Sequence, residues 1–417
     1  MELRGPAPAQ SAASPRIAVV DVLRAFALFG IIITHAADSF LAGPPPDPNF
    51  NFLSSLDRNV HQLANVLTWG KFFTIFSFLF GLSFAIQMGN AARKGKAFVG
   101  RFTWRLMILL GIGTVHNLFF SGDILMIYAV LGLLLIPFRY FSTRALVITA
   151  LILVFNIPGL QLGFAQLNAP TPTPEQQQVA AASQQRFEQS AQRQFHIKQS
   201  GTVAELVEMN VTQSFAMKVM FQIFTGRLWV TFGLFLLGLC AGRVELFKDT
   251  QANRLIFRRL LVWGGVAAAV SSVVVVVYPS SFGPPTLANV LSTFAFSFQQ
   301  ATLSAVYAAA VTLLFWNNPS RGLLPALAPM GKMGLTTYLT QTVFGLVVFY
   351  GFGFGLLGKL GVTVCVALGI GFYALQIFLA QAWMKYFALG PVEWVWRSLT
   401  YFRWQPNARE ALSPVSG

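Results

Sequence analysis

The chain has 417 residues, of which 55% are hydrophobic and only 10% are charged, and its mean hydropathy is +0.61. Because an ordinary soluble domain carries roughly 25% charged residues, this composition excludes a soluble cytosolic enzyme and indicates a polytopic membrane protein. The net charge of +15 would suggest a nucleic-acid partner for a soluble protein. Here we expect no nucleic-acid partner, because basic residues in cytoplasmic loops face anionic lipid headgroups.

Ten apolar segments are predicted to cross the membrane as helices, since a spanning helix needs roughly 20 apolar residues. In chain order these segments are Ile17–Leu41, Phe72–Ala92, Phe102–Phe119, Ile124–Phe138, Leu146–Phe164, Val219–Ala241, Leu260–Tyr278, Leu287–Trp316, Leu335–Phe354 and Leu360–Phe387. The fourth segment is short for a span, and the eighth and tenth are long enough to tilt. We therefore predict an all-α polytopic membrane protein with about ten transmembrane helices.

The distribution of lysine and arginine predicts that both termini are cytoplasmic, because cytoplasmic loops carry the excess of positive charge. With the N-terminus inside, twenty of the 29 basic residues fall in cytoplasmic segments and eight in the opposite ones, while Arg24 lies within the first span. The predicted organisation is a cytoplasmic lead without a cleavable signal peptide (1–16), an N-terminal five-helix half (17–167), an extracytoplasmic polar loop (168–218), a C-terminal five-helix half (219–388) and a cytoplasmic tail (389–417).

Two long polar segments, residues 41–70 and 168–218, lie on the predicted outer side. Residues 41–70 contain three consecutive prolines, followed by a predicted amphipathic helix over Phe52–Leu67. Residues 168–218 are rich in proline and glutamine, lack a core-forming pattern and are predicted to form a partly helical loop. Cys240 and Cys365 lie in apolar runs without ligand spacing, so we expect buried core residues and no metal site.

The first predicted span carries four ionisable residues: Asp21, Arg24, His35 and Asp38. On a helix of 3.6 residues per turn they lie within about 50° of one line, which makes a polar stripe facing a cavity or the bundle interior. Ionisable groups inside a span are expensive, so each is a functional candidate by default. For Asp21 the alternative is a structural ion pair with Arg24, three residues later.

A second polar group lies at the turn between the third and fourth predicted spans. His116 and Asp123 sit at the outer boundary of the membrane, where a histidine can act as a base and an aspartate can orient it. Asp123 also precedes the next helix, so an N-cap role is the alternative. Tyr128 follows inside the fourth span, where a polar side chain usually makes a hydrogen bond between helices.

The segment Arg93–Arg105 between the second and third predicted spans is strongly basic. Such a cytoplasmic loop ordinarily fixes the topology, and the alternative is that it docks a phosphate-rich donor at the membrane face. The chain contains no Walker A motif, no GxSxG and no zinc spacing. ATP-driven transport and soluble-type hydrolase chemistry are therefore not supported.

The opening of the first span, Asp21-Val22-Leu23-Arg24-Ala25 followed by His35, resembles the first helix of transmembrane acyltransferases, in which ten residues separate the arginine and the histidine. The chain also resembles the YeiB-like family of bacterial inner-membrane proteins in six stretches. These stretches are Phe76–Gly81, Arg105–His116, Asp123–Ala129, Gly226–Arg243, Gly331–Leu339 and Gly390–Arg397. YeiB-like proteins commonly have asparagine at the His35 position, so both His35 and His116 stay open as the candidate base.

The resemblance implies a multi-pass protein of the bacterial inner membrane. We predict an acyltransferase that moves an acyl group, acetyl first of all, from a cytoplasmic acyl-CoA to an extracytoplasmic hydroxyl or amine, with acyl-CoA as co-substrate and no permanently bound cofactor. The predicted catalytic residues are His35, His116 and Asp123, and the predicted substrate-binding residues are Arg24, Asp21, Asp38, Tyr128 and Arg227.

The expected partners are membrane lipids, acyl-CoA and an acceptor that is a glycan or a lipid-linked small molecule, and a homodimer is left open. The alternative function is that of a transporter or lipid-handling protein, in which Asp21, Arg24 and His35 form a solute or proton path. The absence of a convincing internal repeat between the two halves weakens the transporter reading.

Overall fold

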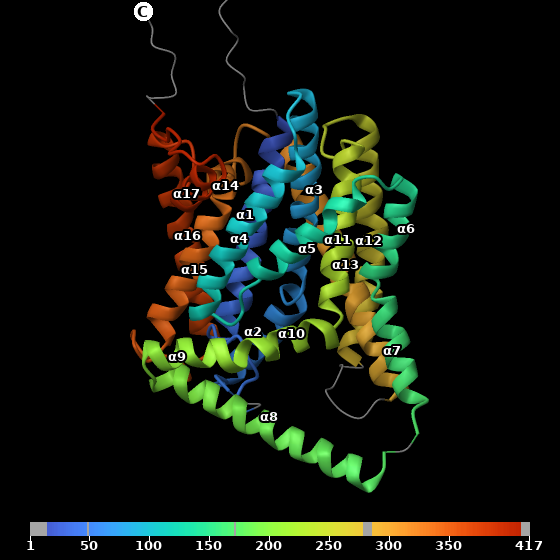
Figure 1. Ribbon diagram of the computed structural model, residues 1–417, viewed down its shortest axis with the longest axis vertical. Helices are drawn as coiled ribbons and strands as arrows, with labels where there is room; N and C mark the ends of the chain where they lie inside the picture. The colour runs from blue at the N-terminus through green and yellow to red at the C-terminus, as the bar shows by residue number, and fades with distance from the viewer. Residues whose placement is uncertain (1–14, 48–49, 171, 278–285, 410–417) are drawn as a thin grey trace, which may run out of the picture.

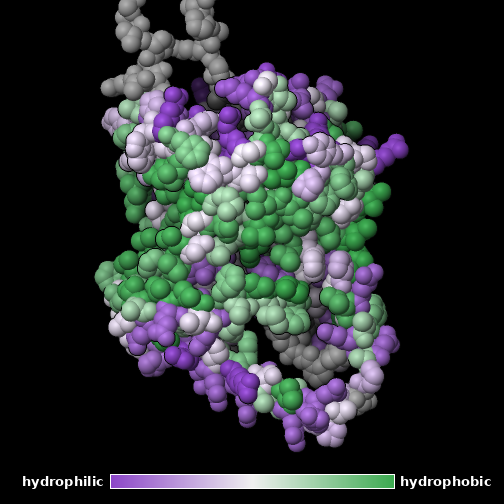
Figure 2. Space-filling view, in the orientation of Figure 1, coloured by the Kyte–Doolittle hydropathy of each residue, from purple (hydrophilic) through white to green (hydrophobic). Residues whose placement is uncertain are grey.

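The computed structural model describes residues 15–47, 50–170, 172–277 and 286–409, and every regular element within them is a helix. Most of the longer helices run side by side as a bundle, and one long helix lies with several shorter ones across one end of it (Figure 1). Apolar side chains cover the middle of the visible face, with hydrophilic side chains gathered above and below (Figure 2). The chain is therefore an all-α polytopic membrane protein, as its composition predicts.

In the described residues, six helical segments are long and apolar enough to cross a membrane. They are α1 (Pro15–Ala37), α2 (Ser55–Leu67) together with α3 (Lys71–Arg93), α4 (Val99–Phe119), α12 (Gln251–Val277), α13 (Leu287–Asn317) and α16 (Val362–Tyr386). Two bent helix pairs raise this number to eight if each pair is one span. Ten spans would also require the shorter apolar helices α5 (Leu125–Phe138) and α15 (Gly334–Phe349) to cross, so the number ten and the cytoplasmic termini stay predictions.

The fifth and sixth predicted spans are broken, which corrects the continuous helices predicted over Leu146–Phe164 and Val219–Ala241. The two pairs are α6 (Thr143–Val154) with α7 (Ile157–Leu167), bent by 44°, and Val203–Phe224 with α11 (Arg227–Arg243), bent by 68°. Asn156 and Gly226 precede α7 and α11 with left-handed backbone angles (φ 52° and 70°). The Asn156 side chain packs against Gly226, where a Cβ would overlap it. Hydropathy does not register such breaks, because one left-handed residue redirects the chain without changing its composition.

The two ends of the bundle differ. We call the end that carries the start of α1 and α17 (Pro391–Thr400) the basal end, and the opposite end, with α2, α8, α9 and α10, the cap end (Figure 1). The predicted amphipathic helix is confirmed as α2. The predicted polar loop 168–218 is mostly helical: it contains α8 (Pro174–Ser200), α9 (Val203–Met209), the π-helical turn η1 (Asn210–Ser214) and the start of α10 (Phe215–Phe224).

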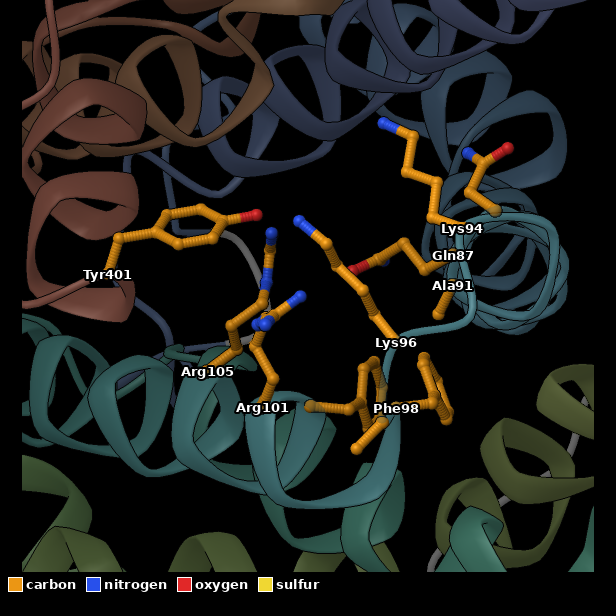
Figure 3. Close-up of a pocket in the computed structure, with 11 residues that line it drawn as sticks. Gln87, Ala91, Lys94, Lys96, Phe98, Arg101, Arg105 and Tyr401 are labelled. Carbon is orange, nitrogen blue, oxygen red and sulfur yellow. The ribbon is translucent and has the colours of Figure 1, made fainter.

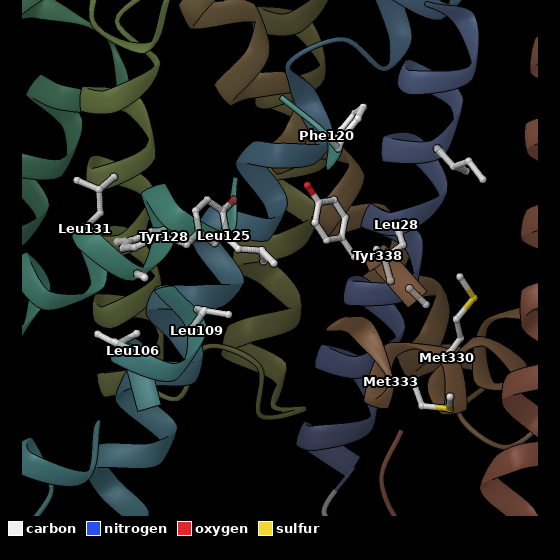
Figure 4. Close-up of a cluster of buried hydrophobic side chains, with 14 of the residues drawn as sticks. Leu28, Leu106, Leu109, Phe120, Leu125, Tyr128, Leu131, Met330, Met333 and Tyr338 are labelled. Atoms are coloured by element: carbon white, nitrogen blue, oxygen red, sulfur yellow. The ribbon is translucent and has the colours of Figure 1, made fainter. Parts of the chain in front are cut away.

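Helix α1 is central, since it packs against α3, α13, α15, α16 and α14 (Leu323–Lys332). The largest buried cluster includes Leu28, Phe120 and Tyr338 from three separate elements (Figure 4). Helix α11, from the predicted C-terminal half, lies directly against α3, because a Cβ at Gly238 would overlap the Phe78 carbonyl. The two predicted halves thus share one core, and the end of α4 is held within it.

Candidate functional site

His116, at the end of α4, is hydrogen-bonded to Asp123 and to a third residue, Thr342. His116 Nδ1 lies 2.8 Å from Asp123 Oδ1, and His116 Nε2 lies 2.9 Å from Thr342 Oγ1 of α15. All three side chains are buried. Because Asp123 also accepts bonds from backbone N–H groups, we assign it as the acceptor of the Nδ1 proton, so that Nε2 accepts from the Thr342 hydroxyl. We call Thr342, His116 and Asp123 the relay.

The carboxylate of Asp123 is fixed by the start of α5 and by a lysine. Its Oδ1 accepts from the Leu125 N–H and its Oδ2 from the Met126 N–H, both at 3.1 Å. Lys218 of α10 lies 3.8 Å from Oδ2 and donates to the Asp123 carbonyl oxygen at 3.2 Å and to Asn117 Oδ1. The helix-capping role and the orienting role therefore coexist in one side chain.

His35 lies near the relay but is held differently. Its ring packs edge-on against Phe120, with centroids 5.3 Å apart, and on Phe40 at 5.6 Å. The His116 ring contacts the same Phe120 at 5.8 Å. Within the described residues the His35 side chain makes no hydrogen bond, so it has no partner that would orient it as a base.

The four ionisable residues of the predicted stripe do not act together in the structure: Asp21 and Arg24 pair with each other, whereas Asp38 lies just beyond the end of α1. Arg24 Nη1 lies 2.5 Å from Asp21 Oδ1, and Arg24 Nη2 donates to Ser83 Oγ of α3 at 2.8 Å. Asp38 instead lies 3.7 Å from His61 of α2. Asp21 is almost fully buried, whereas 28% of the Arg24 side chain is exposed, which is the geometry of an ion pair that leaves the guanidinium accessible.

Tyr128 and Arg227 both contact residues near the start of α3. The Tyr128 hydroxyl is within 2.7 Å of Ser77 Oγ and donates to the Phe73 carbonyl at 3.0 Å, which is a contact between helices. The Arg227 guanidinium lies 4.1 Å from the Phe73 ring centroid, a cation–π contact. No carboxylate of the described residues pairs with Arg227, so its charge is compensated only by aromatic faces.

A basic cavity of about 230 Å³ opens at the basal end (Figure 3). Four basic residues from the end of α3 and the start of α4 line it, and no carboxylate does: they are Lys94, Lys96, Arg101 and Arg105. Arg105 and Arg101 stack over Trp396 and Tyr401, at 4.5 and 5.4 Å. This is the segment in which the sequence predicted either a topological signal or a phosphate site, and its uncompensated charge suits an anion.

Sequence reasoning missed Thr342 and Lys218. Thr342 follows a run of other polar residues in α15, namely Thr336, Thr337, Tyr338, Thr340 and Gln341, and Lys218 was used only in the count of basic residues for the topology. This run of polar residues within one predicted span was the local signal, but it does not single out Thr342. Among the described residues no group of three or more histidine, cysteine, aspartate or glutamate side chains has the arrangement of a metal site.

A family model described as "Protein of unknown function (DUF418)" matches residues 241–403. The uncharacterized protein YxaH of Bacillus subtilis (strain 168) is 31% identical over 417 aligned positions, which cover 95% of this chain and 96% of that protein. The uncharacterized 39.9 kDa protein in the amylase 3' region of Bacillus acidopullulyticus is 26% identical, with 93% and 94% covered.

The uncharacterized protein YeiB of Escherichia coli (strain K12) is 37% identical over 101 residues, which are 24% of this chain and 26% of YeiB. No solved structure matches the chain significantly. The full-length similarity to YxaH, together with the local similarity to YeiB, confirms the predicted family. The chain belongs to the YeiB-like family of membrane proteins.

Proposed function

We propose that this protein is a membrane-embedded acyltransferase of the bacterial inner membrane, with both termini in the cytoplasm. It moves an acyl group, acetyl first of all, from cytoplasmic acyl-CoA to an extracytoplasmic hydroxyl or amine. The observation that carries the proposal is the relay, because acyl transfer needs a base beside the attacking atom and an imidazole oriented by a carboxylate supplies one.

The geometry favours His116 over His35 as the base. Asp123, held by two backbone N–H groups, keeps the proton on Nδ1 and leaves Nε2 free to accept one. His35 has no such orienting partner among the described residues. It lies across Phe120 from His116, where it can line the space that the acyl group enters.

The basic cavity suits the phosphate groups of the donor. It lies at the start of α4, and the relay lies at the end of the same helix. Arg105 and His116 are eleven residues apart, which is about 16 Å along an α-helix, a length comparable to that of an extended pantetheine arm. A donor whose phosphates occupy the cavity could therefore present its thioester at His116.

Arg24 is connected to this cavity through α3, and we assign it a role in donor binding. It donates to Ser83, and Gln87, one turn further along α3, donates to the Ser83 carbonyl at 3.2 Å and lines the cavity. Asp21 then positions the guanidinium. Arg227 and Tyr128, at the other end of α3, would support the wall between donor and relay, and Asp38 at the cap end would contact the acceptor.

Unsatisfied polar atoms at the cap end favour an acceptor that forms hydrogen bonds. Asn210 Oδ1 and Ser214 Oγ in η1 are buried and have no partner among the described residues. Asn210 Nδ2 donates to the Leu118 carbonyl at 2.9 Å, so this turn lies against the end of α4, beside His116. Buried polar atoms without partners are costly, and π-helical turns are frequent at functional sites. The hydroxyl groups of a glycan or a lipid-linked small molecule would satisfy them.

The test is release of free thiol from acetyl-CoA by the purified full-length protein. We expect His116→Ala to lower the rate by about 100-fold or more, the range of a general base. His196→Ala, on the exposed face of α8, is the matched control and should leave the rate unchanged. Size-exclusion profiles and melting temperatures establish that each variant is folded.

Full activity of the His35→Ala, His116→Ala double variant would contradict the proposal. So would a wild-type protein that releases no thiol from acetyl-CoA or longer acyl-CoAs. If solute uptake into proteoliposomes then depended on Asp21 and Arg24, the alternative of a transporter would take its place.

A further inference from the structure

We infer that Thr342 is a nucleophile, and that the acyl group rests on its hydroxyl as an ester between donor and acceptor. The inference rests on the proposed function and adds a covalent intermediate to it. Thr342 is not adjacent in sequence to any predicted site residue, and it reaches the relay because α15 packs beside the end of α4.

The first support is the direction of the Thr342 hydroxyl. Threonine hydroxyls in helices ordinarily bond to the carbonyl four residues earlier. Several threonines of this chain do so, including Thr34, Thr225 and Thr312. The Thr342 hydroxyl instead bonds to His116 Nε2 at 2.9 Å, and this is the only hydrogen bond of its side chain within the described residues. Its oxygen is therefore placed where a base removes its proton.

The second support is a donor for the oxyanion. Tyr338 is one turn before Thr342 on the same face of α15, and its ring centroid lies 5.2 Å from that of His116. The Tyr338 side chain is buried, and its hydroxyl proton has no acceptor among the described residues. A hydroxyl proton without an acceptor, on a side chain that contacts the base, can stabilise the oxyanion of a tetrahedral intermediate.

The third support is the separation of the two substrates. The basic cavity lies at the basal end and the unsatisfied atoms of Asn210 and Ser214 lie at the cap end. His116 has one ring nitrogen that can accept a proton, and Thr342 already occupies it. An acceptor cannot use that nitrogen at the same time, whereas a two-step transfer lets Thr342 and the acceptor use it in turn.

The first half-reaction moves the acyl group from the thioester to Thr342. His116 Nε2 takes the proton of the Thr342 hydroxyl, and Oγ1 attacks the carbonyl carbon of the thioester. The oxyanion accepts a hydrogen bond from Tyr338, and the carbon–sulfur bond breaks as the intermediate collapses. The coenzyme A sulfur leaves with the proton from His116, and Thr342 holds the acyl group as an ester.

The second half-reaction moves the acyl group from Thr342 to the acceptor. The acceptor hydroxyl or amine loses its proton to His116 and attacks the ester carbonyl. The bond between the carbonyl carbon and Thr342 Oγ1 breaks, and Oγ1 regains the proton from His116. No oxidant, reductant or metal is needed, and the enzyme returns to its starting state.

The test incubates the full-length protein with radiolabelled acetyl-CoA without acceptor, quenches in acid and maps the label. We expect acetyl on the peptide that contains Thr342. Thr342→Val should abolish the label and lower thiol release by about 100-fold or more, while Thr342→Ser should retain both. Thr340→Val removes a hydroxyl of the same helix that bonds to the Thr336 carbonyl and to Gln376 but not to the relay, and it should behave as wild type. Tyr338→Phe should slow both thiol release and labelling.

Thiol release at the wild-type rate in Thr342→Val would overturn the inference and leave the proposed function standing. So would label on His116, or an unlabelled Thr342 peptide after more than one equivalent of thiol has been released. A wild-type protein that releases no thiol at all would instead remove the proposed function, so the two failures are distinguishable. The Thr342→Ser variant reports on the hydroxyl even if valine disturbs the fold.

Discussion

Replacing Asp123 by asparagine tests the relay with the smallest change in shape. In the wild type, Oδ1 accepts from His116 and Leu125, and Oδ2 accepts from Met126 and faces Lys218. Asparagine has one acceptor and one donor in these places. Whichever way the amide is turned, its NH₂ group meets either the Met126 N–H and the lysine or the His116 ring.

The two orientations have different consequences. With the oxygen toward His116, the amide NH₂ faces two other donors, and the unpaired groups cost about 1–3 kcal/mol of stability. With the NH₂ toward His116, Nδ1 must accept, so that the proton moves to Nε2 and the imidazole can no longer act as a base toward Thr342. The corresponding substitution in a serine-protease triad lowers turnover by about 10⁴-fold.

We therefore expect Asp123→Asn to lower thiol release from acetyl-CoA by about 10³- to 10⁴-fold, with a lower melting temperature. The matched control is Asp249→Asn, whose carboxylate pairs with Arg254 on the surface at 2.6 and 2.9 Å. It should leave the rate unchanged. An Asp123→Asn protein that is folded and retains the wild-type rate would refute the assignment of Asp123 as the orienting residue.

Three further predictions follow from other contacts. Burial lowers the pKa of Lys198 on α8 to about 7. Between about pH 7 and 10.5 the unfolded chain therefore binds more protons at this site than the folded one, and stability rises with pH. This rise in melting temperature should be smaller in Lys198→Met, and an unchanged rise would contradict the reasoning. Arg101→Gln should weaken acetyl-CoA binding about tenfold with a smaller salt dependence in isothermal titration, whereas Arg186→Gln on exposed α8 should not. Asp21→Asn should lower the melting temperature, because it leaves a partly buried guanidinium unpaired, whereas Arg24→Gln should weaken acetyl-CoA binding while the protein stays folded. Wild-type affinity for acetyl-CoA in folded Arg24→Gln would mean that the pair is only structural.

Much of the fold is predictable from hydropathy, because a lipid environment demands long apolar helices and each predicted span has a helix in the structure. The breaks at Asn156 and Gly226 escape such a prediction. Each break depends on a single left-handed residue. The Asn156 side chain packs against the Gly226 backbone of the other bent pair, and this is a tertiary contact that local sequence does not reveal. The helical content of residues 168–218 was underestimated for a related reason. Lys198 of α8 donates to the Leu41 carbonyl at 2.6 Å, and this contact joins segments that are far apart in sequence.

The candidate site, like the fold, could be predicted only in part. His116 and Asp123 are seven residues apart across one turn, so their pairing could be proposed from local sequence. Thr342 joins them from 226 residues further along the chain, and only helix packing brings it there. Of the stripe predicted on the first span, Asp38 lies beyond the end of α1. Asp38 and Arg24 also take partners on α2 and α3, which periodicity along one helix does not show.

In the proposed function His116, oriented by Asp123, is the base of an acyl transfer. The most direct measurement is the rate of thiol release from acetyl-CoA by the purified wild type and by His116→Ala at equal concentration, with His196→Ala alongside. We predict release by the wild type and by His196→Ala, and a rate lower by about 100-fold or more in folded His116→Ala. Equal rates in all three proteins, or no release by the wild type, would contradict it.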